Sequence, residues 1–264
     1  MFKMILKVVG MLVALFVLTI GLMIGYIFGL NQKPRSGPAL GHGIEQIADS
    51  IATTYYFEVS GGKVVLIDAG NDPTGAPILA ALKNHGKTAD DVEAIFITHA
   101  HPDHDAAVNV FKKAKVYAMK DEVYVADGEQ AYGSPLSALT GKLNPHPFKV
   151  TNPLTDQETV NVGGLNVTAY EVSGHTPGSA VYLADGVLFL GDAASIGSNQ
   201  KIRGPVYLFS TNAAQGNTSL GALMKKLEPR FHEVEFITSS HSGTLPGPQG
   251  LSAIAEYVKD HTQN

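Results

Sequence analysis

The chain contains no cysteine among its 264 residues. It therefore has no disulfide, no thiolate ligand for a metal and no lipid attached through a thiol, and cysteine usage says nothing about its compartment. Charged side chains are also scarce, at 16%, and the net charge is −5. There is no basic patch and no arginine-rich run, which argues against nucleic acid as a partner. The mild acidity is that of an ordinary solvated surface.

Charge is missing altogether from residues 8–30, VVGMLVALFVLTIGLMIGYIFGL. A helix of this length would reach roughly 34 Å, enough to cross a hydrocarbon core of about 30 Å. The alternative is a cleaved signal peptide, whose apolar region is usually about 7–15 residues and ends at a small-x-small site. This stretch is longer and no clear Ala-x-Ala follows it. Residues 1–30 are therefore expected to be a membrane anchor, with a signal segment as the alternative.

The orientation of this segment is nearly balanced. Lys3 and Lys7 flank one end, and Lys33 and Arg35 flank the other. The positive-inside rule counts such side chains and finds two on each side. The terminal amine favours an N-inside arrangement, which would place the rest of the chain outside the cytoplasm.

Three glycines, Gly21, Gly25 and Gly29, recur every fourth residue of the apolar segment. This spacing places them on one helix face, where two helices can approach and form a homodimer, although glycine is common in membrane helices anyway. Residues 31–43, NQKPRSGPALGHG, are predicted to be a Pro/Gly-rich tether. The globular domain is expected over residues 44–264.

Strand and helix patterns alternate through both halves of this domain, which favours an α/β fold. Residues 53–59 and 63–68 are separated by SGG, a hairpin signal. Further strands are predicted at 91–98, 115–119, 158–162, 165–172, 180–185, 187–192 and 234–239. Helices are predicted at 76–86, 106–114, 121–127, 213–227 and 249–260. Residues 130–158 lack periodicity and contain four prolines, so a long, functional or disordered loop is expected there.

Residues 98–105, THAHPDHD, hold three of the ten histidines and two aspartates. They follow a predicted strand and turn at a proline, so His99 and His101 can aim at one point while Asp103 and His104 aim at a neighbouring one. Imidazole and carboxylate together suit zinc, and also manganese or iron. There are too many nitrogen and oxygen ligands here for one closed site, which favours two adjacent metal ions.

The HxHxDH motif after a β-strand resembles the signature of the metallo-β-lactamase fold superfamily. Four further motifs follow in the order found in that family, each after a β run. They are KVVLIDAG with Asp68, SGHTPGS with His175, VLFLGDA with Asp192, and ITSSHSG with His241. The resemblance extends from about residue 50 to 245. It implies a four-layer αββα sandwich with a dinuclear metal site.

The same resemblance implies a ligand set. His99, His101 and His175 would hold the first metal, Asp103, His104 and His241 the second, and Asp192 would bridge both. Asp68 is expected to orient a ligand histidine through its ring N–H. The five remaining histidines are interpreted as non-ligands, with His146 alone placed where it could touch substrate: His42, His85, His146, His232 and His261.

Details of the motifs narrow the branch. The Gly-Asp pair at Asp192 resembles glyoxalase II-like thioesterases, lactonases and phosphodiesterases more than β-lactamases, and the absence of cysteine excludes β-lactamases with a Cys ligand. Flavin-partnered diiron members carry Glu where this chain has His101, and they carry a flavodoxin-like domain that is not evident here. Nucleases of this fold usually carry an added domain, which is not evident here either. Many hydrolases of the family follow HxHxDH with a small glycine pair, whereas this chain has Asp105, Ala106 and Ala107, which leaves the subfamily open.

These features predict a dinuclear, zinc-dependent hydrolase acting on a small-molecule substrate. A hydroxide bridging two metals would attack an ester, thioester or lactone carbonyl, or a related phosphoester. Asp103 would also hold or shuttle the proton, which makes it the predicted catalytic residue. Two alternatives are a mononuclear iron oxidoreductase similar to persulfide dioxygenases and a non-catalytic, membrane-tethered metal-binding module. The intact ligand set argues against the module.

Substrate selection is expected in residues 130–158 and 196–216. Lys142, Lys201 and Arg203 lie there and could meet an anionic end of the substrate, although solvated side chains are the simpler interpretation. Tyr207 could donate to a developing oxyanion, but its VYLF context favours packing in the core.

Overall fold

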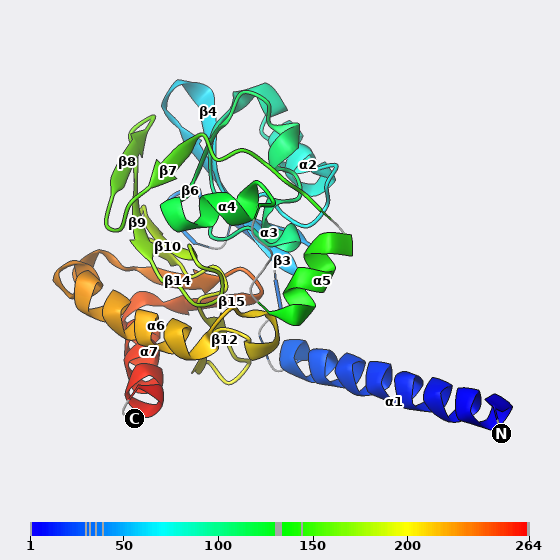
Figure 1. The fold of residues 1–264 in the computed structure, drawn as a ribbon. Coiled ribbons are helices and arrows are strands. Elements are labelled where there is room, and N and C mark those ends of the chain that lie inside the picture. The colour runs from blue at the N-terminus through cyan, green and yellow to red at the C-terminus, as the bar shows by residue number, and fades with distance from the viewer. Residues whose placement is uncertain are drawn as a thin grey trace.

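Two β-sheets pack face to face, and helices cover the outer face of each (Figure 1). This is the four-layer αββα sandwich that the motifs predicted. The structure is a computed structural model that describes residues 2–29, 31, 33, 34, 36–38, 40–129, 134–143 and 145–262.

The first sheet is built from the N-terminal half of the domain. Its strands lie side by side in chain order: β1 Gly37–Pro38, β2 Glu45–Asp49, β3 Ala52–Val59, β4 Lys63–Ile67, β5 Val92–Phe96, β6 Lys115–Met119 and β7 Asn152–Leu154. Strands β1 to β4 are antiparallel, whereas β4 to β7 run parallel to one another. The parallel strands therefore end at the same edge of the sheet. The HxHxDH motif begins at this edge, shortly after β5 ends.

The second sheet comes from the C-terminal half. Its strands are β8 Thr159–Val162, β9 Leu165–Glu171, β10 Ala180–Ala184, β11 Val187–Phe189, β14 Phe236–Ser239 and β15 Ser242–Pro246. Their order is β15-β14-β11-β10-β9-β8, with β11 and β14 parallel and the other pairs antiparallel. A short ribbon, β12 Ser195–Ile196 with β13 Ile202–Arg203, lies beside it.

Helices occupy the two outer layers. Helices α2 Ala76–Asn84, α3 Pro102–Asp105 and α4 Val123–Ala126 lie on the side of the first sheet, and α6 Ala213–Leu227 and α7 Gly247–His261 cover the second (Figure 1). Helix α5 Pro135–Leu143 lies against the segment Tyr207–Phe209. Single 3₁₀ turns are found at Ser60–Gly62, Ala89–Asp91, Val108–Val110, Lys120–Glu122, Tyr207–Phe209 and Glu228–Glu233.

The period-2 alternation of the strands decides which layer each side chain joins. In β4, Val65 and Ile67 point between the two sheets, where they meet the other sheet's inner face. Val64 and Leu66 point the other way and pack with Ile78 of α2. All five side chains are fully buried, and each such burial stabilises the fold by about 1.5–3 kcal/mol.

Helix α1, Phe2–Gly29, projects away from the domain (Figure 1). Within it, Lys3–Met23 is long and apolar enough to cross a membrane, judged by length and composition. The Cβ positions of Gly21, Gly25 and Gly29 face open space, so a homodimer through this helix stays a prediction. The orientation also stays a prediction, and one of its flanking residues, Arg35, lies outside the described residues.

The segment 31–43 contacts the domain where the structure describes it. Asn31 is buried and forms an antiparallel bridge with Gly197, β1 pairs with β2, and Leu40 is fully buried between the sheets. The tether predicted here stays a prediction, although the described parts of it have partners in the domain. The boundaries 1–30, 31–43 and 44–264 themselves stay predictions.

Two expectations need correction. The predicted helix at 106–114 is a 3₁₀ turn, Val108–Val110, within irregular chain, since β-branched valines and asparagine favour helix only weakly. The predicted loop at 130–158 contains α5 and β7. Residues 130–133 and 144 of that loop lie outside the described residues.

Candidate metal centre

All seven predicted ligands lie at one edge of the sandwich, where strands of both sheets end. His99, His101, Asp103 and His104 follow β5, and His175 lies in the β9–β10 loop. Asp192 follows β11, and His241 occupies the turn between β14 and β15. Because β4 and β5 are parallel, as are β11 and β14, their carboxyl ends deliver these loops to a common point.

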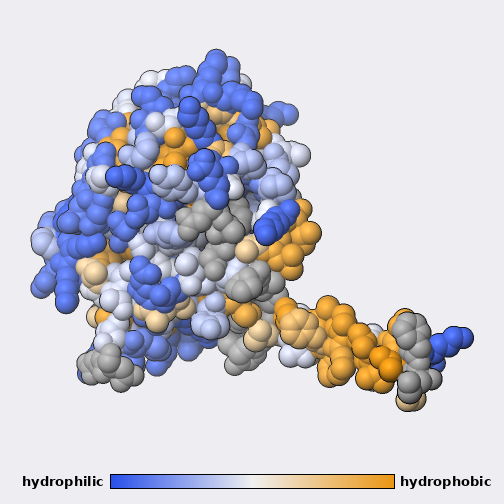
Figure 2. Space-filling view, viewed as in Figure 1, coloured by the Kyte–Doolittle hydropathy of each residue, from blue (hydrophilic) through white to orange (hydrophobic). Residues whose placement is uncertain are grey.

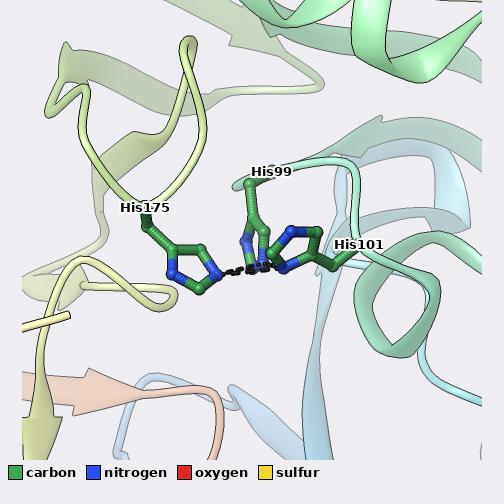
Figure 3. Close-up of side chains that lie close together, drawn as sticks. All are labelled: His99, His101 and His175. Atoms are coloured by element: carbon green, nitrogen blue, oxygen red, sulfur yellow. Dashed lines mark hydrogen bonds between the residues drawn. The ribbon is translucent and has the colours of Figure 1, made fainter. Parts of the chain in front are cut away.

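Three imidazoles form the first cluster (Figure 3). The Nε2 atoms of His99 and His175 lie 3.2 Å apart, and Nδ1 of His101 lies 3.1 Å from the first and 3.0 Å from the second. Nitrogens that share a tetrahedral zinc at about 2.0–2.1 Å are separated by about 3.3 Å. The three side chains are buried, and their nitrogens therefore fit one metal ion without rearrangement.

The second cluster consists of Asp103, His104 and His241. His241 Nε2 lies 3.3 Å from His104 Nε2 and 3.2 Å from Asp103 Oδ2. Asp192 stands between the clusters, with its Oδ2 3.6 Å from His175 Nε2 and 3.1 Å from His241 Nε2. Its other oxygen, Oδ1, is buried and has no hydrogen-bond partner among the described residues. The donor set thus fits two neighbouring metal ions with one shared carboxylate.

The outer nitrogens of four of these imidazoles, those of His99, His104, His175 and His241, meet a hydrogen-bond acceptor. Nδ1 of His241 donates to the carbonyl of Ile51 at 2.7 Å, and Nδ1 of His175 donates to Ser210 Oγ at 3.1 Å. Ser210 Oγ in turn donates to the carbonyl of Val206, so it must accept from the ring. A proton on Nδ1 leaves the Nε2 lone pair facing the cluster, the form in which imidazole binds metal.

Asp68 performs this role for His104, as the sequence predicted. Its Oδ2 accepts from His104 Nδ1 at 2.8 Å and from Thr98 Oγ1. Its Oδ1 accepts from Thr98 N. Asp68 has φ of +62°, an uncommon backbone conformation for a residue other than glycine. The strain is of the kind found at functional sites, and here it turns the carboxylate from the end of β4 toward the ligand loop.

Burial sets the charge of the first cluster. It lowers the pKa of His99 well below its usual value, and those of His101 to about 3 and His175 to about 4, with repulsion from neighbouring imidazoles adding to the effect at each. These rings are therefore neutral at neutral pH, the protonation state that binds a metal ion.

The second cluster is charged instead. Burial opposes ionisation of His241, but the carboxylates of Asp192 and Asp103 outweigh it and raise the pKa of that imidazole well above its usual value. Burial likewise opposes ionisation of the two aspartates, yet the nearby imidazoles hold the pKa of each carboxyl well below its usual range. Without a metal, the cluster is thus a set of buried ion pairs whose protons a metal ion would replace.

Glu122 was not singled out from the sequence, yet it ties the two ligand loops of the first cluster together. The fully buried carboxylate accepts from Ala100 N at 2.6 Å, from Thr176 Oγ1 at 2.8 Å and from Gly178 N at 2.9 Å. Ala100 lies between His99 and His101, and Thr176 directly follows His175. No local sequence pattern marks this glutamate, because its three partners lie 22 to 56 residues away.

The residues that replace the usual glycine pair are accommodated within the fold. Ala106 N and Ala107 N donate to the carbonyls of Gly70 and Ala69, and both alanines are buried. Asp105 is buried as well, and neither of its oxygens has a hydrogen-bond partner within the described part of the chain. Burial, reinforced by nearby carboxylates, raises the pKa of Asp105 well above its usual value, which favours the neutral acid.

A cavity of about 220 Å³ opens beside the clusters. It is lined by Asn31, Ile51, His101, Asp103, Asp192, Ala194, Ser195, Gly204, Val206, Phe209 and His241. Gly204, Val206 and Phe209 of the segment 196–216 line the cavity, whereas no described residue of 130–158 does, and substrate selection by either segment stays a prediction. Its described lining contains no lysine or arginine.

The other candidate residues lie elsewhere. Lys142 and Lys201 are exposed and, like Arg203, do not line the cavity. Tyr207 is 81% exposed, so the interpretation that it packs in the core is wrong. Tyr207 lies in the 3₁₀ turn Tyr207–Phe209, of which only Phe209 lines the cavity. None of the five histidines interpreted as non-ligands belongs to a cluster of potential metal ligands in the described chain: His42, His85, His146, His232 and His261.

Comparison with known proteins agrees with this geometry. A family profile described as "Metallo-beta-lactamase superfamily" matches residues 48–231. A hydroxyacylglutathione hydrolase from Dechloromonas aromatica (strain RCB) is 33% identical over 135 residues, which is 50% of this chain and 40% of that protein. The chain thus spans less than half the length of this relative. The relative belongs to the glyoxalase II-like branch that the Gly-Asp pair predicted.

Solved structures show the same fold at low identity. A metallo-β-lactamase family protein from Thermus thermophilus superimposes with a TM-score of 0.63 and 20% identity, covering 85% of this chain and 81% of that one. A B3 metallo-β-lactamase with an active-site glutamic acid gives 0.65 and 15%, covering 89% and 91%. With the profile spanning most of the domain and the ligand motifs meeting at one edge of the sandwich, the chain belongs to the metallo-β-lactamase superfamily.

Proposed function

We propose that the protein is a dinuclear, zinc-dependent hydrolase of carbonyl esters, with a thioester as the preferred bond. The observation that carries this proposal is the position of Asp192 between two clusters of buried ligands, within 3.6 Å of a histidine of each. The similarity to hydroxyacylglutathione hydrolases supports a thioester, the bond named in their substrate. Two metal ions held here would activate water and polarise a carbonyl oxygen.

The chain's own residues would position and deprotonate the reactants. Asp103 lies at the boundary of the second cluster and the cavity, and its side chain is 21% exposed. Because its carboxylate is ionised at neutral pH, it is available to accept a proton from the attacking water and to pass it to the leaving sulfur or oxygen.

The cavity favours an acyl group over a phosphodiester. Its non-ligand lining is neutral and mostly apolar, through Ile51, Ala194, Val206 and Phe209. A charged phosphodiester would usually meet a cationic side chain, and the described lining offers none. An acyl chain, in contrast, loses water-exposed apolar surface on entering.

The test is a substrate screen with metal analysis on the purified, full-length protein. We expect two zinc ions per chain and turnover of thioesters or esters ahead of phosphodiesters and β-lactams. Asp103→Asn should lower kcat at least a hundredfold, whereas His232→Asn, an exposed histidine remote from the clusters, should leave it unchanged. Full zinc occupancy without turnover of any class would contradict the proposal. One iron per chain with oxygen uptake would instead support a dioxygenase.

A further inference from the structure

The cavity is too small to enclose a large substrate. Pockets that envelop a drug-sized ligand usually measure about 300–1,000 Å³, whereas this one measures about 220 Å³. A long substrate can therefore place only its reacting carbonyl and the adjoining part of its chain inside. The remainder must lie over the rim, so the chemistry of the rim determines what kind of molecule is bound.

One side of the cavity is formed where the apolar helix joins the domain. Asn31 lines the cavity beside Ser195, whose Oγ donates to Asn31 Oδ1 at 3.5 Å. Helix α1 ends only two residues earlier, at Gly29, and two residues span at most about 7 Å. Its 28 residues correspond to about 42 Å, close to the thickness of a bilayer with its headgroups. The candidate span Lys3–Met23 ends six residues before Gly29, about 9 Å along the helix. A membrane that holds this span would therefore have its surface near the cavity.

Exposed apolar side chains gather on the same side. The large hydrophobic side chains exposed in the described part of the domain are Ile51, Tyr124, Leu139, Leu143 and Tyr207. Ile51 lines the cavity, and Tyr207 belongs to the 3₁₀ turn that contributes Phe209 to its wall. Leu139 and Leu143 lie on α5, which packs against that turn without lining the cavity. Figure 2 shows hydrophobic side chains over α5, on the side of the domain from which α1 departs.

Two of these side chains are fastened to the cavity wall through helix α5. Leu139 and Leu143 lie on α5, and the hydroxyls of Ser134 and Ser137 donate to the carbonyls of Leu208 and Phe209. Leu143 is 76% exposed on this helix. Ile51, by contrast, lines the cavity directly. Tyr207 lies in the sequence between Val206 and Phe209, which both line it. These four residues are called the apolar rim.

We propose that the cavity opens at the membrane surface and that its substrate is a membrane-held amphiphile, an acyl thioester or ester with a long hydrocarbon chain. This inference rests on the proposed function and on α1 spanning a membrane. The apolar rim dips into the headgroup layer, and the acyl chain passes from the lipid over it to the ligand clusters. Water is consumed there: its oxygen joins the carbonyl carbon, the carbon–sulfur or carbon–oxygen bond breaks, one of its protons goes to the leaving thiol or alcohol, and the other leaves with the carboxylic acid product.

The first experiment uses tryptophan, which the chain lacks entirely. Leu143→Trp and Tyr207→Trp place a single fluorophore on the apolar rim, and Tyr124→Trp places one on an exposed position of α4 as the matched control. In the full-length protein reconstituted into phosphatidylcholine vesicles, brominated lipid should quench the two rim tryptophans at least twofold more than the control. Equal quenching at all three positions overturns the proposal, including the case in which a second copy of the chain covers the rim.

The second experiment measures chain-length selectivity without requiring turnover. Non-hydrolysable thioether analogues with C2 and C16 chains are titrated into the zinc-loaded protein in vesicles, with hydrolysis of the matching thioesters followed separately. The C16 analogue should bind at least tenfold more tightly than the C2 analogue, and equal affinities overturn the inference. Tenfold selectivity in binding without hydrolysis of either thioester supports the membrane-facing cavity while contradicting the proposed function, so the two failures are distinguishable.

Discussion

Hydrogen bonds at the outer nitrogens of His99 and His104 set the tautomer and direction of these imidazoles. Thr98 Oγ1 donates to Asp68 and so accepts from His99 Nδ1, while Asp68 itself accepts from His104 Nδ1. Each ring is thereby fixed in the tautomer and direction that a metal needs. Outer hydrogen bonds of this kind hold ligand side chains in place, which reduces the reorganisation that metal binding would require.

A substitution in the second cluster tests whether two metals are present. His241→Asn removes the ring that closes this cluster while leaving the three histidines of the first in place. We expect the zinc content, measured by plasma mass spectrometry, to fall from two to one per chain, and thioester turnover to fall at least a hundredfold. His42→Asn, which changes an exposed histidine on Glu235, is the control and should retain both ions. Retention of two zinc ions by His241→Asn would contradict the assignment of His241 to the second metal, and one zinc ion per wild-type chain would contradict the dinuclear assignment.

Glu122 makes stability depend on pH in the metal-free protein. Burial raises the pKa of its carboxyl to about 7 from 4.5, against the opposing effect of its three hydrogen bonds. The folded protein therefore holds this proton more tightly than the unfolded chain does. The resulting stability is complete below pH 4.5 and is lost as the pH rises through 7, a change on the order of 3 kcal/mol.

Glu122→Gln removes this titration. Urea unfolding in the presence of chelator, between pH 4.5 and 7.5, should show the wild type losing stability relative to the variant as the pH rises. The other titrating groups are common to both proteins and cancel in the difference. Parallel stability curves for the two proteins would show that Glu122 keeps an ordinary pKa.

Among the elements, strands were predicted well and irregular segments poorly. Residues 115–119 form β6 with the predicted bounds, as do residues 213–227 for α6. Their patterns are local: a run of β-branched and aromatic residues, or apolar residues at helical spacing. Helix α5 was missed because its sequence, PLSALTGKL, carries little periodicity. Hydrogen bonds from Ser134 and Ser137 to a distant segment hold it in place.

Close packing between two ligand-bearing elements explains the glycine before Asp192. Gly191 has φ of +53°, and a Cβ there would lie 2.7 Å from Thr98 Cβ, next to His99. Gly191→Ala should destabilise the protein by about 1–3 kcal/mol through overpacking and should weaken zinc binding.

Gly86→Ala is the matched control for this substitution. Gly86 has a comparable φ of +66° but nothing within 4 Å of its Cβ position, so it reports the backbone strain alone. Urea unfolding should show Gly191→Ala to be the more costly change by at least about 1 kcal/mol. Equal losses would mean that the contact with Thr98 relaxes freely.

Over the whole molecule, the candidate metal centre joins the two sheets. Four predicted ligands follow a strand of the first sheet, and three follow strands of the second. A metal shared between them would act as a bridge across the sandwich and would favour the folded state. Its removal should therefore lower stability as well as activity.

The expected fall in Tm on removal of the metal by a chelator can be estimated. A ligand at about 1,000 times its Kd stabilises by about 4 kcal/mol, and each kcal/mol corresponds to about 2–4 °C in a domain of this size. EDTA should thus lower Tm by about 10 °C in calorimetry, and zinc should restore it while calcium, which prefers oxygen ligands, should not. An unchanged Tm would mean that no structural coupling exists between the metal centre and the fold.

The sequence was sufficient for the superfamily and for the class of fold. The ligand types, their order along the chain and their places after apolar strands are local properties, which hydrophobic patterning and the HxHxDH spacing express directly. The tertiary structure alone brought Glu122 to the ligand loops, turned Tyr207 outward, and set Asn31 into the cavity wall. Those outcomes depend on which distant segments pack together, because a hydrogen bond or a buried contact between remote residues leaves no periodic trace in either segment.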